Sequence, residues 1–437
     1  MEGRKAKVNK TLICILCCAV CWAAVLGIAF GLMCAAAAVP QEKLSENLIS
    51  SCDKLAVHDP HEKTLEGQYS SICDNYADAV LLGVAANISS EDIPRSVIDT
   101  KYFDDDYGPA VGIRATLSGK EANVDYTRYW HGSLVFVRPL LALTDIDGIR
   151  LIGTAVIVLL LAGNIFLLLR GKHTAAAVIF AVSACLVHIW FVFTTLEYMT
   201  VFIIMLLALP LYVRFTDNLP VLAVISVGVG TLTAFADFLT AETLTILVPL
   251  TVSFFVTAEN GEKPDGKKSL AKVISCGAAW GAGYLLTFAA KWLIASAALG
   301  RDISDAAVTA AEKRLFGMEG DITSPLEMFV SSLGANFSAL APVPEKISAV
   351  GAIVWIAVFA AVCAVIYRLD KRKHNLPKAA VITIAAVPVV RFMVLMNHSF
   401  MHSFFTYRAL MPSIMAVIGL MWYRVGGNTP QKKPRKK

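Results

Sequence analysis

Charged residues are scarce in this chain of 437 residues, since Asp, Glu, Lys and Arg together make up only 17% of it. Apolar residues make up 56%, and the mean hydropathy is +0.62. Soluble globular domains carry about 25% charged residues. The composition therefore excludes an ordinary soluble protein and predicts a polytopic membrane protein.

Several common catalytic signatures are also absent. The sequence contains no nucleophile elbow, no Walker loop, no GxGxxG and no HExxH. The net charge of +5 comes from basic residues spread over short segments and a C-terminal tail, with no aromatic residues interleaved. This distribution indicates contact with membrane lipids and argues against a nucleic-acid partner.

Apolar runs long enough for a membrane-spanning helix, which needs about 20 residues, occur along most of the chain. The first run follows a basic stretch and is too long for a cleaved signal peptide, so we expect a signal anchor. Lys and Arg are concentrated in alternate connections and in the tail, which predicts a plasma-membrane protein with both termini in the cytoplasm. The predicted spans are 11–38, 150–170, 174–193, 198–213, 219–236, 240–257, 273–298, 348–367, 378–396 and 404–423.

We therefore expect an all-α polytopic membrane protein, with about ten transmembrane helices and a mainly helical extracytoplasmic loop domain after the first. The expected segments are a tail and first helix (1–38), the loop domain with interfacial helices (39–149), helices two to seven (150–298), a second outer loop (299–347), helices eight to ten (348–423) and a basic cytoplasmic tail (424–437). Within the loop domain, residues 68–88 have helical periodicity and 128–150 suggest a second interfacial helix. Cys52 and Cys73 both lie in this segment, so a disulfide between them is an open alternative.

Ionisable residues of the spans and outer segments gather on the predicted outer side. Such groups are costly at membrane depth and usually face a cavity or one another, so their placement predicts a polar cleft that opens outward. They are Asp74, Asp78, Arg128, His131, Arg138, Glu197, Asp237, Glu242, Lys291, Arg391, His398, His402 and Arg408.

Each of these residues also has an ordinary explanation. Asp74 and Asp78 form one face of a helix that water could cover, and Lys291 could extend to lipid headgroups. His398 and His402 have the spacing of a zinc-binding pair, but zinc needs a third or fourth ligand that the spacing does not supply. We therefore predict no metal site here.

The layout resembles the GT-C superfamily of integral-membrane glycosyltransferases, which combine a first span, a large outer loop and many further spans. The motifs YWHG, DFLT, KW and NHS…H…YR are similar to those of poorly characterised multi-pass proteins of Gram-positive bacteria. The resemblance implies a sugar donor on a polyprenyl phosphate, with Asp74 as the catalytic base and Asp78 second. Basic groups near the outer surface would hold the phosphate. The candidates are Arg128, His131, Arg138, Lys291, His398, His402 and Arg408, with Asp237 beside them.

The residues thus suggest transfer of a sugar to an extracytoplasmic glycan, lipid or protein. A base would take the acceptor's proton, and positive charge would stabilise the leaving phosphate. The acidic run 104–106 is a rival carboxylate cluster or a site for a divalent cation. A transporter or flippase for a lipid-linked substrate is the alternative, and it would need polar residues along a path to both sides. A structural or sensory protein is the third reading.

Overall fold

A computed structural model describes residues 2–262, 264–340 and 376–425, together with the single positions 353, 357 and 361. Helix makes up 76% and strand 3%, which confirms the predicted helical class. The N-terminal elements are α1 (Glu2–Ala37), α2 (Glu42–Ala56), β1 (His61–Lys63), η1 (Tyr69–Ser71), β2 (Ile72–Asp74), α3 (Asn75–Asn87), α4 (Ile93–Ile98), β3 (Lys101–Tyr102), α5 (Gly108–Leu117), β4 (Val124–Asp125) and α6 (Leu134–Leu141). The later elements are α7 (Ile146–Arg170), α8 (Thr174–Leu186), η2 (Ile189–Thr194), α9 (Leu196–Arg214), α10 (Leu219–Ala236), α11 (Leu244–Glu259), α12 (Gly266–Leu299), α13 (Ser304–Phe316), α14 (Pro325–Leu340), α16 (Lys378–Val394), α17 (Met396–Met401), α18 (Ser403–Thr406), η4 (Tyr407–Leu410) and α19 (Met411–Val425).

Among the described residues, six helices are long and apolar enough to cross a membrane. They match six of the ten predicted spans and are Lys10–Ala37, Ile146–Arg170, Leu196–Arg214, Leu219–Ala236, Gly266–Leu299 and Ser403–Tyr423. The predicted span 378–396 corresponds to α16. The predicted span 348–367 lies outside the described residues, apart from three single positions.

Two predicted spans appear as shorter apolar helices, α8 and α11. The sequence pattern extended the first of them to residue 193, whereas α8 ends at Leu186. His188 follows in the left-handed conformation, with φ of 52°. A non-glycine residue rarely adopts this conformation, and here it redirects the chain into η2 before α9 begins.

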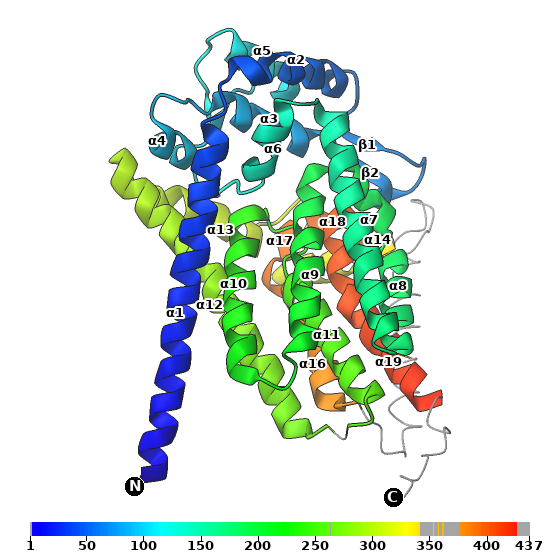
Figure 1. Ribbon diagram of the computed structural model, residues 1–437. Coiled ribbons are helices and arrows are strands. Elements are labelled where there is room, and N and C mark those ends of the chain that lie inside the picture. Colours follow the sequence, from blue (N-terminus) through cyan, green and yellow to red (C-terminus); the bar gives the residue numbers. More distant parts are fainter. Residues whose placement is uncertain are drawn as a thin grey trace, which may run out of the picture.

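Residues 39–145 form a loop domain at one end of the helical bundle (Figure 1). The start of α1 and the end of α19 lie at the opposite end (Figure 1). Helices α2 to α6 make up most of the loop domain, and two short antiparallel hairpins, β1–β2 and β3–β4, complete it. In the first hairpin His61 pairs with Asp74.

Helix α3 is the core of the loop domain. It begins at Asn75, later than the periodicity of 68–88 suggests, because the residues before it form η1 and β2. Ten of its residues are buried, including the whole run from Asp78 to Ala86. A helix buried on every face is apolar all round, which explains why the sequence here looked like an apolar interfacial helix.

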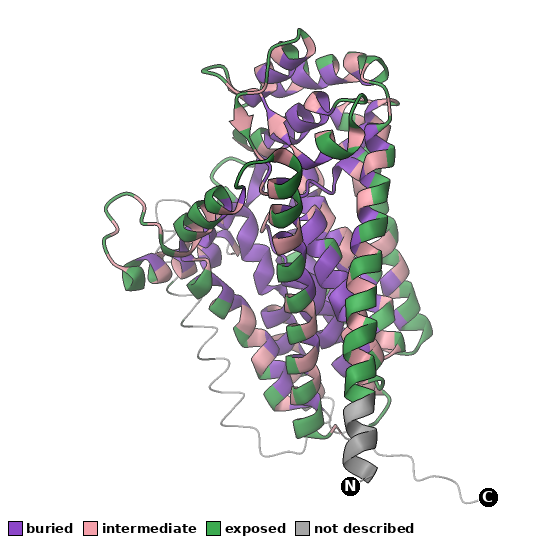
Figure 2. Cartoon of the chain, turned by 90° about the vertical axis from the view of Figure 1, so that its left-hand side faces the viewer, coloured by how far each residue is buried: buried purple, intermediate pink, exposed green. Residues whose placement is uncertain are grey.

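Burial divides the bundle into inner and outer helices. Helix α11 is buried along nearly its whole length, whereas α1 and α7 expose apolar side chains such as Leu16, Val20 and Leu159. Figure 2 shows the buried residues inside and the exposed ones on the outer helices. Exposed apolar faces are what lipid-facing helices require, so α1 and α7 lie at the membrane-facing edge of the bundle.

Arg138 on α6 ties two helix ends together. Its side chain is fully buried. It donates hydrogen bonds to the carbonyl oxygens of Ala36 and Ala37, the last residues of α1, and of Val39 just after it. It also donates to Ala85 and Ile88 at the end of α3. Helix C-termini leave carbonyl groups without partners inside the helix, and one guanidinium group satisfies both ends here.

Buried polar contacts fasten the loop domain to the bundle. Asp78 forms an ion pair of 2.7 Å with Arg150 of α7, and its other oxygen accepts a hydrogen bond from the backbone N–H of Leu196. Lys291 of α12 donates to the carbonyl oxygen of Ile98, at 2.7 Å. These contacts fix the position of α3 relative to α7 and α9, and that of α4 relative to α12.

Cys52 and Cys73 are both free, so the disulfide considered from the sequence does not form. The thiol of Cys73 points toward η2 and donates to the carbonyl oxygen of Thr194, at 3.1 Å. Cys52 is buried on α2.

Candidate functional site

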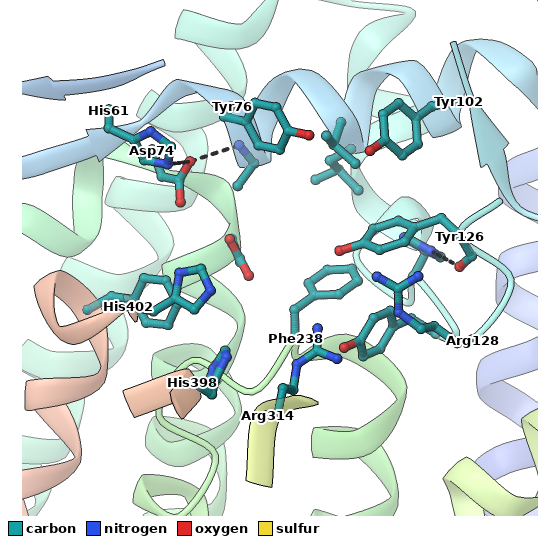
Figure 3. A pocket seen from close by; sticks show the side chains of 17 residues that line it. His61, Asp74, Tyr76, Tyr102, Tyr126, Arg128, Phe238, Arg314, His398 and His402 are labelled. Carbon is teal, nitrogen blue, oxygen red and sulfur yellow. Dashed lines mark hydrogen bonds and ion pairs between the residues drawn. The ribbon is translucent and has the colours of Figure 1, made fainter. Parts of the chain in front are cut away.

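A cavity of about 340 Å³ lies between the loop domain and the helical bundle (Figure 3). From the loop domain, its wall takes β1, β2, α3, β3 and the segment between β4 and α6. From the bundle side it takes the start of α9, the loop after α10, α13, α17 and α18. The lining residues are His61, Asp74, Tyr76, Ala77, Val80, Leu81, Tyr102, Tyr126, Arg128, Tyr129, His131, Glu197, Phe238, Arg314, His398, His402 and Phe405.

Asp74 is the buried carboxylate of this cavity, with 5% of its surface exposed. It lies where β2 ends and α3 begins, and its side chain accepts a hydrogen bond of 2.9 Å from the backbone N–H of Ala77. This is the usual role of Asp at a helix N-cap. Burial nevertheless raises the pKa of Asp74 to about 6. A carboxylate with such a pKa suits a general base at neutral pH.

His61 faces Asp74 across the β1–β2 hairpin. Its Nε2 lies 3.7 Å from Oδ1 of Asp74, while 51% of the His61 side chain is exposed. Figure 3 shows this pair beside Tyr76 at one end of the cavity. The imidazole therefore connects a buried carboxylate to solvent.

Two arginines line the part of the cavity away from Asp74 (Figure 3). The guanidinium group of Arg128 lies 4.5 Å from the ring centre of Tyr126 and 5.2 Å from that of Tyr129. Arg314 of α13 lies 5.7 Å from the same Tyr129 ring. In the described part of the chain neither guanidinium has a carboxylate partner, and Nε of Arg128 is buried without a hydrogen bond. Unpaired guanidinium groups in a cavity are suited to bind an anion such as a phosphate.

Glu197, at the start of α9, is a second carboxylate of the cavity. It lies within electrostatic range of Asp74. Aromatic rings form much of the remaining wall, and Phe238 lies 5.4 Å from Tyr129 between ring centres. The cavity thus combines acidic, basic and flat apolar surfaces, as expected for a polar ligand with a ring or chain attached.

Three histidines of the wall are held neutral. Burial lowers the pKa of His131 to about 3 and that of His402 to about 4, and it lowers the pKa of His398 as well. Nε2 of His131 lies 3.0 Å from the carbonyl oxygen of Tyr126, and Nε2 of His398 lies 2.9 Å from that of Leu239. A carbonyl only accepts, so Nε2 carries the proton in both rings. Their Nδ1 atoms are left as acceptors.

Two loops with unusual backbone conformations meet at the cavity. His131 has φ of 55° and Leu239 has φ of 68°. The backbone N–H of Gly132 donates to the carbonyl oxygen of Phe235 at 2.8 Å, and a Cβ at Gly132 would collide with Phe235. Strained backbone of this kind is concentrated at functional sites, and here the surrounding contacts hold it in place.

The structure brings together five of the ten site residues predicted from the sequence. They are Asp74, Arg128, His131, His398 and His402. Four of the others contact protein groups instead. Asp78 pairs with Arg150, Arg138 binds helix ends, Lys291 binds Ile98, and Asp237 accepts hydrogen bonds from Thr240.

Arg408 is buried but does not line the cavity. Its guanidinium group lies between the rings of Tyr198, at 4.8 Å, and Tyr407, at 5.0 Å. Its three side-chain nitrogens have no hydrogen-bond partner among the residues that the structure describes. Arg408 was predicted to bind a phosphate in the same site as Asp74, but it does not line the cavity. The arginines that do line it are Arg128 and Arg314.

Sequence reasoning did not select His61, Arg314 or the tyrosines of the wall. His61 lies in a polar loop, and Arg314 follows Glu312 and Lys313 on a helix that looks solvated. In the stretch from Tyr126 to Tyr129, Arg128 lies between two tyrosines, and this pattern could have indicated the site. The motif YWHG includes only the second of these tyrosines.

No group of three or more His, Cys, Asp or Glu side chains that could hold a metal ion occurs within the described residues. The chain matches no family model, no curated protein and no solved structure. The geometry of the cavity is therefore the basis for assigning a function.

Proposed function

We propose that the protein is a membrane glycosyltransferase of the GT-C type, which moves a sugar from a polyprenyl-phosphate donor to an extracytoplasmic glycan, lipid or protein. The observation that carries the proposal is one cavity with Asp74 opposite two guanidinium groups that have no carboxylate partner within the described residues. Its position between the loop domain and the bundle suits a donor whose lipid tail stays in the membrane.

In this mechanism Asp74 takes the proton of the acceptor hydroxyl as the hydroxyl oxygen attacks the anomeric carbon. Glu197 lies close enough to orient the acceptor. Arg128 and Arg314 contact the phosphate, whose negative charge grows as the bond to the sugar breaks. Positive groups that are already in place stabilise this transition state more than the ground state.

The experiment uses the purified full-length protein in phospholipid vesicles with short-chain prenyl-phosphate hexoses labelled in the sugar. We expect release of prenyl monophosphate together with labelled product when extracts of surface glycan or lipid are supplied as acceptors. Movement of intact donor across the vesicle membrane, without release of prenyl monophosphate, would instead identify a transporter and contradict the proposal.

Arg314→Gln is expected to raise the KM for the donor about 10–100-fold, because a charge-assisted hydrogen bond contributes about 1.5–3 kcal/mol. The matched control is Lys313→Gln, which removes an exposed positive charge next to it on α13. Equal effects of the two substitutions on KM would mean that donor binding depends only on the positive charge of this surface. Arg314 would then not contact the donor.

A further inference from the structure

At neutral pH the proposed transfer releases between zero and one proton to the solution in each turnover. The donor phosphodiester carries one negative charge, and the prenyl monophosphate that leaves carries between one and two at neutral pH, since the second pKa of a phosphate is about 6. The acceptor oxygen replaces the phosphate on the sugar, and its proton passes to the base. Asp74 therefore ends each cycle protonated and has to lose this proton before the next acceptor binds.

Asp74 itself has poor access to water. Only 5% of the residue is exposed, and one carboxylate oxygen already accepts a hydrogen bond from Ala77. When acceptor and donor fill the cavity, they cover the side of Asp74 that faces it. His61 also faces Asp74. Its ring is half-exposed, and its Nε2 lies 3.7 Å from Oδ1 of Asp74, the oxygen that accepts from Ala77.

We propose that His61 is the proton exit of the site. Nε2 of the ring accepts the proton from Asp74, and the ring then loses a proton from Nδ1 to water or buffer, which regenerates the carboxylate. Proton exchange between the two nitrogens through water returns the ring to its starting tautomer before the next turnover. Imidazole is suited to this role because its two nitrogens accept and release protons on different sides. The distance of 3.7 Å closes to hydrogen-bond reach with a movement of about 1 Å, as is common when a substrate-free site closes on its ligand. This inference rests on the proposed function.

The fold holds the ring of His61 in this place from three sides. Residue pairing in the β1–β2 hairpin sets His61 directly opposite Asp74. The ring stacks on Tyr76, with 6.2 Å between centres and 18° between planes, and contacts the edge of Phe404 at 5.8 Å. His402 also lies within electrostatic range of His61, and it is neutral because burial lowers its pKa to about 4. Glu62 next to His61 pairs with His58 at 2.8 Å, so it does not compete for the ring.

The experiment compares the wild-type protein with His61→Phe, which keeps a ring for Tyr76 and Phe404 but cannot carry a proton. We expect kcat for transfer from the prenyl-phosphate hexose to fall about 100-fold, which is the lower range for lost acid–base catalysis, with an unchanged KM for the donor. Added free imidazole is expected to restore the rate of this variant in proportion to its concentration and to leave the wild type unaffected. Glu66→Gln, at an exposed position of the same loop, is the control.

The role of His61 is contradicted if His61→Phe retains full kcat, or if its lost activity is not restored by imidazole. The second result would mean that the ring only packs against its neighbours. His61→Gln is tested in the same way, so that poor folding of one variant does not decide the outcome. Absence of transfer by the wild type would overturn the proposed function itself, which keeps the two failures apart.

Discussion

Asp74→Asn is expected to lower sugar transfer about 1,000-fold, within the range of 10²- to 10⁴-fold that general-base catalysis contributes. Asn keeps the size of the side chain and its hydrogen bond to Ala77 but cannot accept a proton. The measurement is the rate of prenyl monophosphate release by purified protein, with donor binding measured in parallel. Binding should be retained, because Arg128 and Arg314 are unchanged.

The matched control is Asp106→Asn, in the exposed acidic run that the sequence offers as a rival carboxylate cluster. This substitution should leave the rate unchanged. A full loss in Asp106→Asn with normal transfer by Asp74→Asn would move the base to the acidic run and contradict the assignment.

The raised pKa of Asp74 sets the direction in which the transfer rate changes with pH. Burial raises the pKa of Asp74 from 3.8 to about 6, so the carboxyl is protonated and inactive as a base below that pH. We expect kcat/KM to rise with pH through about 6 and then to level off. The stability of the fold changes with pH in the opposite direction. The raised pKa of Asp74 contributes its full stabilisation below pH 3.8, and this contribution is lost as the pH rises through 6. Asp74→Asn should therefore unfold at a slightly higher temperature than the wild type at pH 7.

Arg138→Met is expected to reduce the free energy of unfolding of the loop domain by about 3–5 kcal/mol, because removing one partner of a buried polar group leaves the other unpaired. The guanidinium group of Arg138 satisfies carbonyl oxygens at the ends of both α1 and α3, where Ala37, Ala85 and Ile88 are buried. Met fills a similar volume but donates no hydrogen bond. The measurement is the thermal unfolding midpoint in detergent, together with the protein level in membranes.

Arg95→Met is the appropriate comparison, since Arg95 is an exposed arginine of the same domain. It should change the free energy of unfolding by less than about 0.5 kcal/mol, the usual effect of a surface substitution. An equal, small effect of the two substitutions would mean that the carbonyl groups at the ends of α1 and α3 find other hydrogen-bond donors. Arg138 would then not be needed to hold these two helix ends together.

Much of the helical fold could be predicted from the sequence because lipid demands long apolar runs. The runs that became α1, α7, α9, α10 and α12 have this form. The break after α8 could not be predicted in this way, since it depends on one residue, His188, adopting a left-handed conformation that its neighbours stabilise. The pattern of apolar residues in a sequence indicates which segments are buried or face lipid, but it does not indicate where the backbone changes direction.

The site was less accessible to sequence reasoning because residue type does not fix which way a side chain points. Asp74 and Asp78 are one helical turn apart, yet Asp74 faces the cavity and Asp78 faces Arg150. Lys291 looked like a phosphate ligand, but it binds the carbonyl oxygen of Ile98 from a distant part of the chain. Such choices depend on contacts between segments far apart in the sequence.

The order in which the cavity is assembled has a consequence for biogenesis. Its wall runs from His61 in the first hairpin to Phe405 in α18, so it needs elements from nearly both ends of the chain. A chain leaves the ribosome from its N-terminus at about 5–20 residues per second. Asp74 is therefore synthesised long before Arg314, His398 and His402. A half-made or truncated chain has the proposed base but lacks part of the cavity wall, so under the proposed function we expect it to be inactive until the last helices are in place.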